Sequence, residues 1–383
     1  QERRQTLIER SLFAVDNHLL DEAVTTLRGL SELEFDPEVD SMLEEILEEH
    51  GRFGDLITHL ERKAGREGYE ADMAAIHFSI AGIYLDHMKL PADAARHVGL
   101  ALDAAPGSDA IVAFAEAMVS DKTARGRADW APGLIDRAIE SLRSMPGAES
   151  RLINMLRMRI DGCDSPSVIA AALGEIARVE CARGNTRECF DAMMGALGAT
   201  PDDPEVLDLV MRNACGAGFV KDAVEGIVAI AEPMARADRQ RLLMAAAGLA
   251  ARDGNDAATA ERIYIGLADR YPDSVEALAA LDGLHEARGD AASRIPILAR
   301  MADLADDTDE RRDIRFKAGL LAAEVADWQR ALELMGQVID ERPDPAVADA
   351  RAIEAAPTMV DAAIALERFE VAAGTRMLVA GSV

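Results

Sequence analysis

Residues 248–272 read GLAARDGNDAATAERIYIGLADRYP, and the spacing of residues inside this stretch indicates how the chain folds. A glycine opens it, the small residue Ala260 follows twelve positions later, and Pro272 closes it after twelve more. The glycines at 248, 283 and 319 stand 35 and 36 residues apart, which indicates a repeated unit of that length. The other copies of the spacing, complete or partial, are Gly82, Ala94, Pro106; Gly319, Ala331, Pro343; Gly283, Ile295; Leu134, Pro146; and Cys189, Pro201.

Each position of this triplet has a physical reason. Apolar residues at helical spacing surround Gly82, so the glycine is predicted to lie inside a first helix, where it costs about 1 kcal/mol relative to Ala. We therefore expect two helices to cross there too closely for a side chain. The small residue falls early in a second helix, and the proline stops that helix. Gly with Asn or Asp marks turns at 183–185, 253–255 and 288–290.

These signals predict an all-α fold, an α-solenoid of stacked antiparallel helix pairs. Only 4% of the residues are aromatic, and no long stretch alternates between apolar and polar residues, so a sheet is not expected. The 383 residues exceed one ordinary hydrophobic core, but a solenoid grows by contacts between neighbouring units alone.

The triplet resembles the unit of tetratricopeptide-repeat (TPR) proteins, a helix-turn-helix of about 34 residues. Trp328 and Tyr264 stand where that family places aromatic residues. The resemblance is to a divergent, bacterial-type array and implies a right-handed superhelix. It is poorest near the N-terminus, where Ser11 and Glu44 replace the glycine. Armadillo and HEAT repeats, which are longer and lack this spacing, are the second choice.

The spacing also divides the chain. We expect divergent TPR-like repeats over residues 1–146, an irregular unit over 147–183, regular repeats over 184–343, and C-terminal helices over 344–383. The irregular unit should hold an extra helix, because Leu134 and Cys189 are separated by about twenty residues more than one repeat needs. The last residues do not read as a complete helix pair, so the array is expected to be truncated or to continue.

The acidic composition of the chain limits the kinds of partner that it is expected to bind. Lys plus Arg number 41 and Asp plus Glu number 69, and 41 − 69 gives a net charge of −28, which weighs against nucleic-acid binding. Residues 32–49 hold nine carboxylates and no Lys or Arg. This segment is either a solvated helix face or a docking stripe for a basic segment of a partner.

Membrane insertion and export are not indicated. No apolar run is long enough to span a bilayer, and residues 1–4 lack a hydrophobic signal segment. We expect a cytoplasmic location, with removal of an export signal as the alternative because the chain begins at Gln1. The cysteines form no CxxC pair, and Cys189 is predicted to be a small buried residue. No pattern supports a disulfide.

No catalytic, cofactor-binding or metal-binding motif is present. The seven histidines form no HxxxH or HExxH arrangement, and there is no P-loop, GxGxxG, GxSxG or EF-hand spacing. The acidic run 306–310 reads as the cap and first turn of a helix. We therefore expect a chain that is not an enzyme and needs no cofactor.

In TPR proteins the first helices line a concave groove, and the resemblance transfers that groove to this chain. The groove is expected to be apolar and Ala-rich with occasional Arg, and no Lys stands beside an Asn to clamp a terminal carboxylate. An amphipathic helix or extended apolar segment fits such a lining, unless these positions pack against neighbouring helices. The residues predicted to bind a partner are Ile83, Arg178, Arg212, Leu249, Arg252, Leu284, Arg288, Phe316 and Leu320.

The predicted function is a non-catalytic protein–protein interaction scaffold or adaptor that binds a protein or peptide. The hypothesis is a helix-in-groove contact that involves Leu249, Leu284 and Leu320. The alternative is a regulatory or sensory repeat array attached to an effector domain of a longer protein. Neither hypothesis involves nucleic acid or direct membrane insertion.

Overall fold

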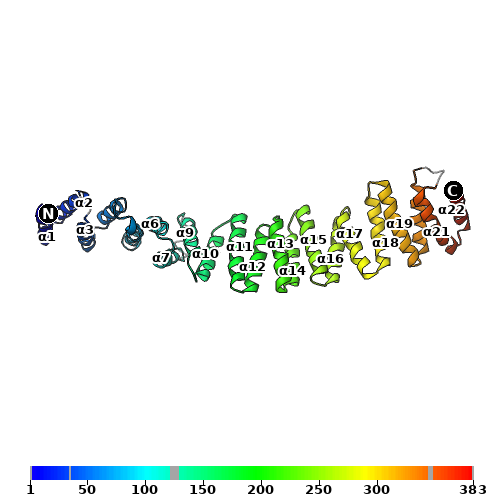
Figure 1. Ribbon diagram of the computed structural model, residues 1–383, viewed down its shortest axis with the longest axis horizontal. Helices are drawn as coiled ribbons and strands as arrows, with labels where there is room; N and C mark the ends of the chain where they lie inside the picture. The colour runs from blue at the N-terminus through cyan, green and yellow to red at the C-terminus, as the bar shows by residue number, and fades with distance from the viewer. Residues whose placement is uncertain (1, 34–35, 121–128, 344–347, 382–383) are drawn as a thin grey trace. The chain divides into compact units, whose positions relative to one another are not determined.

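The computed structural model describes residues 2–33, 36–120, 129–343 and 348–381, and every regular element in these ranges is a helix (Figure 1). The chain divides into two compact units, residues 1–192 and 193–383. Within each unit, helices that follow one another in sequence pack against one another. The all-α helix-pair fold is therefore confirmed.

The first unit consists of helix pairs and one additional helix, α10. Its helices are α1 (Glu2–Asp16), α2 (Leu20–Leu33), α3 (Pro37–Glu49), α4 (Phe53–Ala64), α5 (Met73–Ile83), α6 (Pro91–Ala104), α7 (Asp109–Ser120), α9 (Ala131–Arg143), α10 (Glu149–Asp161) and α11 (Pro166–Ala182). A 3-10 turn (Glu70–Asp72) precedes α5, and a π-helical turn (Tyr84–Met88) extends it. Helix α12 (Thr186–Ala199) spans the division between the units.

The second unit continues the same order of helices. Its helices are α13 (Pro204–Ala217), α14 (Val220–Ala231), α15 (Arg236–Arg252), α16 (Ala257–Arg270), α17 (Val275–Arg288), α18 (Ala291–Leu304), α19 (Thr308–Glu324), α20 (Trp328–Asp340), α21 (Ala350–Ala365) and α22 (Phe369–Ala380). Odd-numbered members are the first helices of their pairs here, and even-numbered members are the second. Residues 350–380 thus form a pair, although the sequence pattern did not predict a complete one there.

Helix α10 explains the long spacing between Leu134 and Cys189. Leu134 lies in α9 and Cys189 lies in α12, each the second helix of its pair. Helix α10 stands between these pairs in sequence and packs against both α9 and α11.

The small residue of the triplet is buried wherever the triplet is complete. Ala94, Ala260 and Ala331 each have 0% of their surface exposed, as the spacing predicts. The divergent N-terminal pairs follow the same rule, since Ala23 in α2 is 0% exposed and Leu56 in α4 is 4% exposed. The prolines of the triplets follow the ends of α6, α16 and α20, which also confirms the prediction.

The expected role of the glycine, a helix crossing too close for a side chain, is wrong at three of its four positions. A Cβ built on Gly82 or Gly283 would meet nothing within 4 Å, so no close helix crossing requires glycine there. A Cβ on Gly248 would make only ordinary or slightly tight contact with side-chain ends. Only Gly319 is crowded, because its Cβ would lie 2.8 Å from Cε of Met335 in α20.

The predicted turns use left-handed backbone conformations. Gly184 has φ +79° and Gly289 has φ +69°, values that favour glycine. In the third turn the left-handed residue is Asn255, with φ +46°, rather than Gly254. Asparagine tolerates this region better than most residues with a side chain, which is why the turn still forms.

A disulfide joins Cys181 in α11 to Cys189 in α12, with Cα atoms 5.3 Å apart. It closes the turn that contains Gly184. The predicted burial of Cys189 is confirmed at 0% exposure, but the thiol is not free, which corrects the expectation from the cysteine pattern. Cys163 and Cys215 are unbonded. Among the described residues, no helix has the length and apolarity needed to cross a membrane.

Candidate partner-binding surfaces

The apolar residues predicted to bind a partner differ in their exposure. Leu320 in α19 is 43% exposed, while Leu284 in α17 and Phe316 in α19 are half-buried. Leu249 in α15 is only 2% exposed and belongs to the packed interior, so it offers no surface to a partner. We call Leu284, Phe316 and Leu320 the first-helix face.

The arginines predicted to bind a partner are exposed, and several contact groups of this chain. Arg212 pairs with Asp208 one turn earlier in α13, at 3.1 Å. Arg288 at the end of α17 pairs with Glu261 of α16 at 2.5 Å, so its guanidinium reaches toward a second helix. Nε of Arg252 donates a hydrogen bond to the backbone carbonyl of Gly248, one turn earlier in the same helix. The remaining predicted residues, Ile83 and Arg178, lie in the first unit, where Ile83 is half-buried against the core and Arg178 is exposed.

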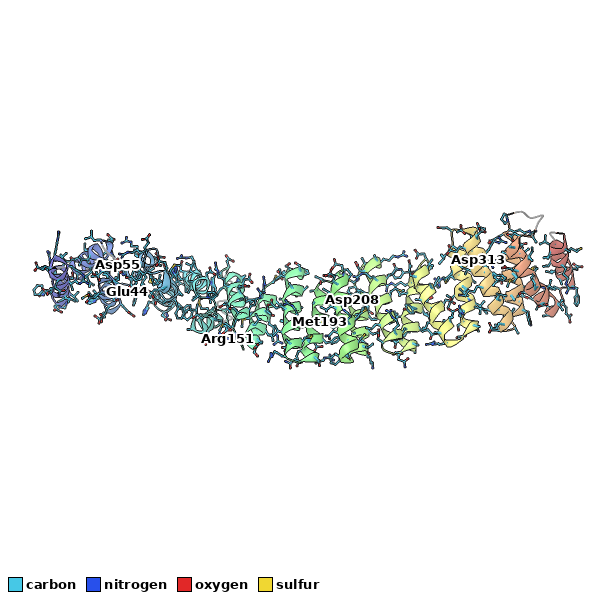
Figure 2. All side chains as sticks on the ribbon, in the orientation of Figure 1. Glu44, Asp55, Arg151, Met193, Asp208 and Asp313 are labelled. Carbon is cyan, nitrogen blue, oxygen red and sulfur yellow. A yellow bond between two sulfur atoms is a disulfide. The ribbon has the colours of Figure 1, made fainter. Side chains whose placement is uncertain are left out.

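A charged hollow of about 370 Å³ lies between the first helices α19 and α21. Arg312, 3% exposed, holds both carboxylate oxygens of Asp349 at 2.7 and 2.8 Å, and the pKa of Asp349 is lowered by this guanidinium. Figure 2 labels Asp313, one of the exposed acids at its edge. The predicted apolar lining does not describe this part of the first-helix side. The residues lining the hollow are Asp309, Arg312, Asp313, Asp349, Ala350, Arg351 and Glu354.

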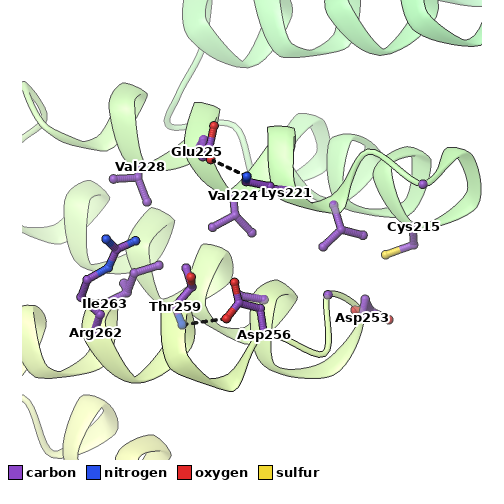
Figure 3. A pocket seen from close by; sticks show the side chains of 14 residues that line it. Cys215, Lys221, Val224, Glu225, Val228, Asp253, Asp256, Thr259, Arg262 and Ile263 are labelled. Carbon is purple, nitrogen blue, oxygen red and sulfur yellow. Dashed lines mark hydrogen bonds and ion pairs between the residues drawn. The ribbon is translucent and has the colours of Figure 1, made fainter.

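A larger hollow of about 760 Å³ lies between the second helices α14 and α16 (Figure 3). We call it the second-helix cavity. Its floor is apolar and its edges are charged, with Lys221 and Glu225 on one edge and Asp256 and Arg262 on the other. The full lining is Cys215, Gly218, Val220, Lys221, Val224, Glu225, Val228, Ala250, Asp253, Gly254, Asp256, Thr259, Arg262 and Ile263.

Sequence reasoning missed the second-helix cavity because it placed binding on the first helices alone. A signal was present: Val220, Val224 and Val228 recur every four residues, which puts them on one face of α14. Such a stripe usually packs against a neighbouring helix, so the sequence does not show that part of it faces a hollow.

The cavity holds the exposed thiol of Cys215 at one end. Burial of the sulfur raises its pKa, and the carboxylate of Asp253 adds to the rise. This thiol is therefore a weaker nucleophile at neutral pH than an ordinary cysteine. Asp256 at the same end caps α16 by accepting the backbone N–H of Thr259 at 3.0 Å.

The acidic segment 32–49 is partly neutralised by its own chain. Arg4 pairs with Asp36 and Glu38, Arg62 pairs with Glu32, and Lys63 pairs with Glu44. Asp40 is fully buried and accepts a hydrogen bond from Tyr69. The exposed remainder is Glu45, Glu48 and Glu49, and Glu34 lies outside the described residues.

Clusters of chemically reactive groups are sparse. The described residues contain no group of three His, Cys, Asp or Glu placed to hold a metal ion. Two histidines of the first unit meet with 3.1 Å between the Nδ1 atoms of His77 and His97. Burial lowers the pKa of both rings, that of His97 to about 4, so the pair is neutral at physiological pH.

The run of acids before α19 acts as the sequence predicts. Asp307 is the N-cap of α19, and its carboxylate accepts the backbone N–H of Glu310 at 2.8 Å. The structure thus consists of helix pairs, and in the three complete triplets the second helix carries a buried alanine and ends before a proline. The array is TPR-like.

No family model matches the chain of this TPR-like array, and no curated protein matches it either. Solved structures do match. Yeast Tom70 is 11% identical over 96% of each chain, and a tetratricopeptide repeat protein from Parabacteroides merdae is 12% identical over 70% of this chain and 93% of its own. Naa15/Naa10 bound to HypK-THB is 12% identical over 94% of this chain and 66% of that one. The TM-score is 0.24 in each case, so the TPR-like description rests on the helix pairs themselves.

Proposed function

We propose that the chain is a non-catalytic protein-interaction scaffold whose first-helix face binds a helix or extended segment of a partner protein. The observation that supports this most is Leu320, which is 43% exposed near the C-terminal end of α19. Phe316 lies one turn earlier on the same side of that helix and is half-buried. A solenoid that presents apolar side chains in this way has surface available for another protein.

The neighbouring charges favour a partner with basic residues. The side chains of Asp309, Asp313 and Glu354 are 87%, 58% and 57% exposed around the charged hollow. Arg312 is held by Asp349, and Arg351 pairs with both Asp313 and Glu354, so the four carboxylates of the hollow still outnumber its two guanidinium groups. Arg351 lies over the ring of Phe316, 4.9 Å from its centre, and so connects the hollow to the first-helix face. The partner segment is proposed to combine apolar side chains with flanking Lys or Arg.

Substitution of Leu320 by Glu should weaken partner capture by about tenfold or more, because it removes a buried apolar contact and places a carboxylate beside other carboxylates. The matched control is Leu209→Glu in α13. Leu209 is 42% exposed and does not occupy a predicted groove position. Its substitution by Glu therefore changes the charge and solubility of the chain as much as Leu320→Glu does. The measurement is affinity capture from lysate of the source organism with quantitative mass spectrometry of the bound proteins.

A protein whose capture falls with Leu320→Glu and persists with Leu209→Glu supports the proposal. Retention at high salt assigns the binding to the apolar side chains, whereas loss at high salt assigns it to the charged hollow. Equal capture by both variants and the unchanged chain contradicts a role for the first-helix face.

A further inference from the structure

The second-helix cavity has a floor built for apolar contact. Val224, Ala250 and Ile263 are 5%, 2% and 9% exposed, so they form a packed base. Val220 and Val228 are half-buried at the two ends of the α14 stripe. These side chains come from α14, α15 and α16, which pack in that order, so the floor is a fixed part of the second unit.

The corresponding gap one pair further along is narrower. Between α16 and α18, Arg300 donates to the carbonyl of Ala268 at 2.5 Å and joins the two second helices. The hollow left there is about 210 Å³ and includes Leu278 and Leu281 of α17. The hollow between α14 and α16 is therefore much larger than the next one along the second unit.

Opposite charges stand at the two ends of the cavity. Arg262 lies at the Val228 end and has no hydrogen bond or ion pair in the described part of the chain (Figure 3). Asp253 lies at the Cys215 end and has no cation within ion-pair distance there. Lys221 and Glu225 on the rim are 3.9 Å apart and largely neutralise each other. The field along the cavity thus runs from the guanidinium of Arg262 to the carboxylates of Asp253 and Asp256 at the Cys215 end.

The walls of the second-helix cavity favour a helical ligand over an extended one. Both walls are α-helices, whose backbone N–H and C=O groups are already paired along their length. They offer no free strand edge to an extended peptide, whereas a helix satisfies its own backbone. About 760 Å³ over an apolar floor accommodates several side chains from one face of such a helix.

We propose that the second-helix cavity binds an amphipathic helix of a partner protein, with an acidic end at Arg262 and a basic end at Asp253. Acidic residues favour the N-terminus of a helix and basic residues favour its C-terminus. The bound helix therefore runs antiparallel to α14 and α16, over about three turns. This site is separate from the first-helix face and does not depend on it.

The test uses two synthetic peptides of about eighteen residues, both carrying a leucine stripe at helical spacing. The matched peptide has Glu in its first turn and Lys in its last turn, and the reversed peptide exchanges them. Fluorescence anisotropy at about 50 mM salt, where charge effects are strong, measures the dissociation constants for the full chain. The matched peptide should bind about fivefold more tightly than the reversed one.

The charge variant is Arg262→Glu, and the matched control is Arg270→Glu at the exposed end of the same helix, outside the cavity. Arg262→Glu should invert the preference between the peptides, while Arg270→Glu should leave it unchanged. The two peptides differ in intrinsic helicity, but that difference is the same whichever chain they bind. An inverted preference in Arg262→Glu therefore cannot result from peptide helicity. A second readout is alkylation of Cys215 in a Cys163→Ser chain, which the matched peptide should slow.

Three results would overturn the inference. The first is absence of binding, or equal effects of Arg262→Glu and Arg270→Glu. The second is loss of peptide binding in Leu320→Glu alone, which would leave the proposed function standing and move the helix to the first-helix face. The third is protection of Cys215 that rises with the concentration of the chain itself, which would assign the cavity to a second copy.

Discussion

At the scale of single residues, the triplet predicts packing correctly for alanine and proline but not for glycine. Ala94, Ala260 and Ala331 are fully buried because each lies in the first turn of a second helix, where that helix packs against the first helix of its pair. The glycine itself lies in a first helix, but the spacing of residues in the sequence does not show how closely a neighbouring helix approaches that glycine. Gly283 consequently faces open space, whereas Gly319 faces Met335.

Ala331→Phe should lower the free energy of unfolding by about 1–3 kcal/mol, because the added ring cannot enter a fully packed site without displacing α19 or α20. Urea denaturation followed by circular dichroism measures the change. Unaltered stability would show that this position is not a packing anchor.

The two glycines offer a paired test. Gly283→Ala should stabilise the chain by about 0.5–1 kcal/mol, since alanine is the better helix former and meets no neighbour. Gly319→Ala should gain less or lose stability, because its Cβ presses on the fully buried Met335. Equal gains at both positions, measured in the same denaturation experiment, would contradict the crowding at Gly319.

At the scale of helices, burial of a histidine predicts how pH acts on α5 and α6. Burial, with Arg96 and His77 nearby, lowers the pKa of His97 from 6.5 to about 4, so the unfolded chain binds its proton more readily. The stability contributed by the neutral ring is present above about pH 6.5 and is lost as the pH falls toward about 4.

The expected result is that His97→Gln reduces this fall in unfolding free energy between pH 6.5 and 4 relative to the unchanged chain. Comparing the slopes removes any constant loss of stability caused by the substitution itself. Identical slopes in the two chains would mean that His97 is not the group that titrates.

The disulfide between α11 and α12 predicts how many cysteines carry a free thiol. Since Cys181 and Cys189 are joined, alkylation of the unfolded but unreduced chain should modify only Cys163 and Cys215. Mass spectrometry before and after reduction makes the measurement, and four modified cysteines before reduction would show that the disulfide is absent.

At the scale of the molecule, the sequence predicts the architecture better than the surfaces. The all-α pairs follow from local signals, namely helical spacing, left-handed turns and prolines, which act within one repeat. The surfaces depend on how adjacent pairs pack. Leu249 is buried although it occupies the same register as Leu284 and Leu320, and the hollow between α14 and α16 has a much smaller counterpart between α16 and α18.

The high negative charge likewise does not locate a binding stripe by itself. Arg4, Arg62 and Lys63 occupy several carboxylates of segment 32–49, and these partners lie up to 34 residues away in sequence. Pairing over such separations cannot be read from a count of charges. The acids around α19 and α21 are likewise partly paired within the chain, since Arg351 contacts Asp313 and Glu354 while Asp309 is 87% exposed.

The most direct test of the scaffold function is site-specific photo-crosslinking from the first-helix face. A benzoylphenylalanine placed at Leu320 and, as the control, at Leu209 would be irradiated in lysate of the source organism, and the crosslinked peptides identified by mass spectrometry. Position 320 should crosslink reproducibly to one segment of a protein, rich in apolar residues and flanked by Lys or Arg, and position 209 should not. The same products from both positions, or none from position 320, would contradict the claim that this face binds a partner.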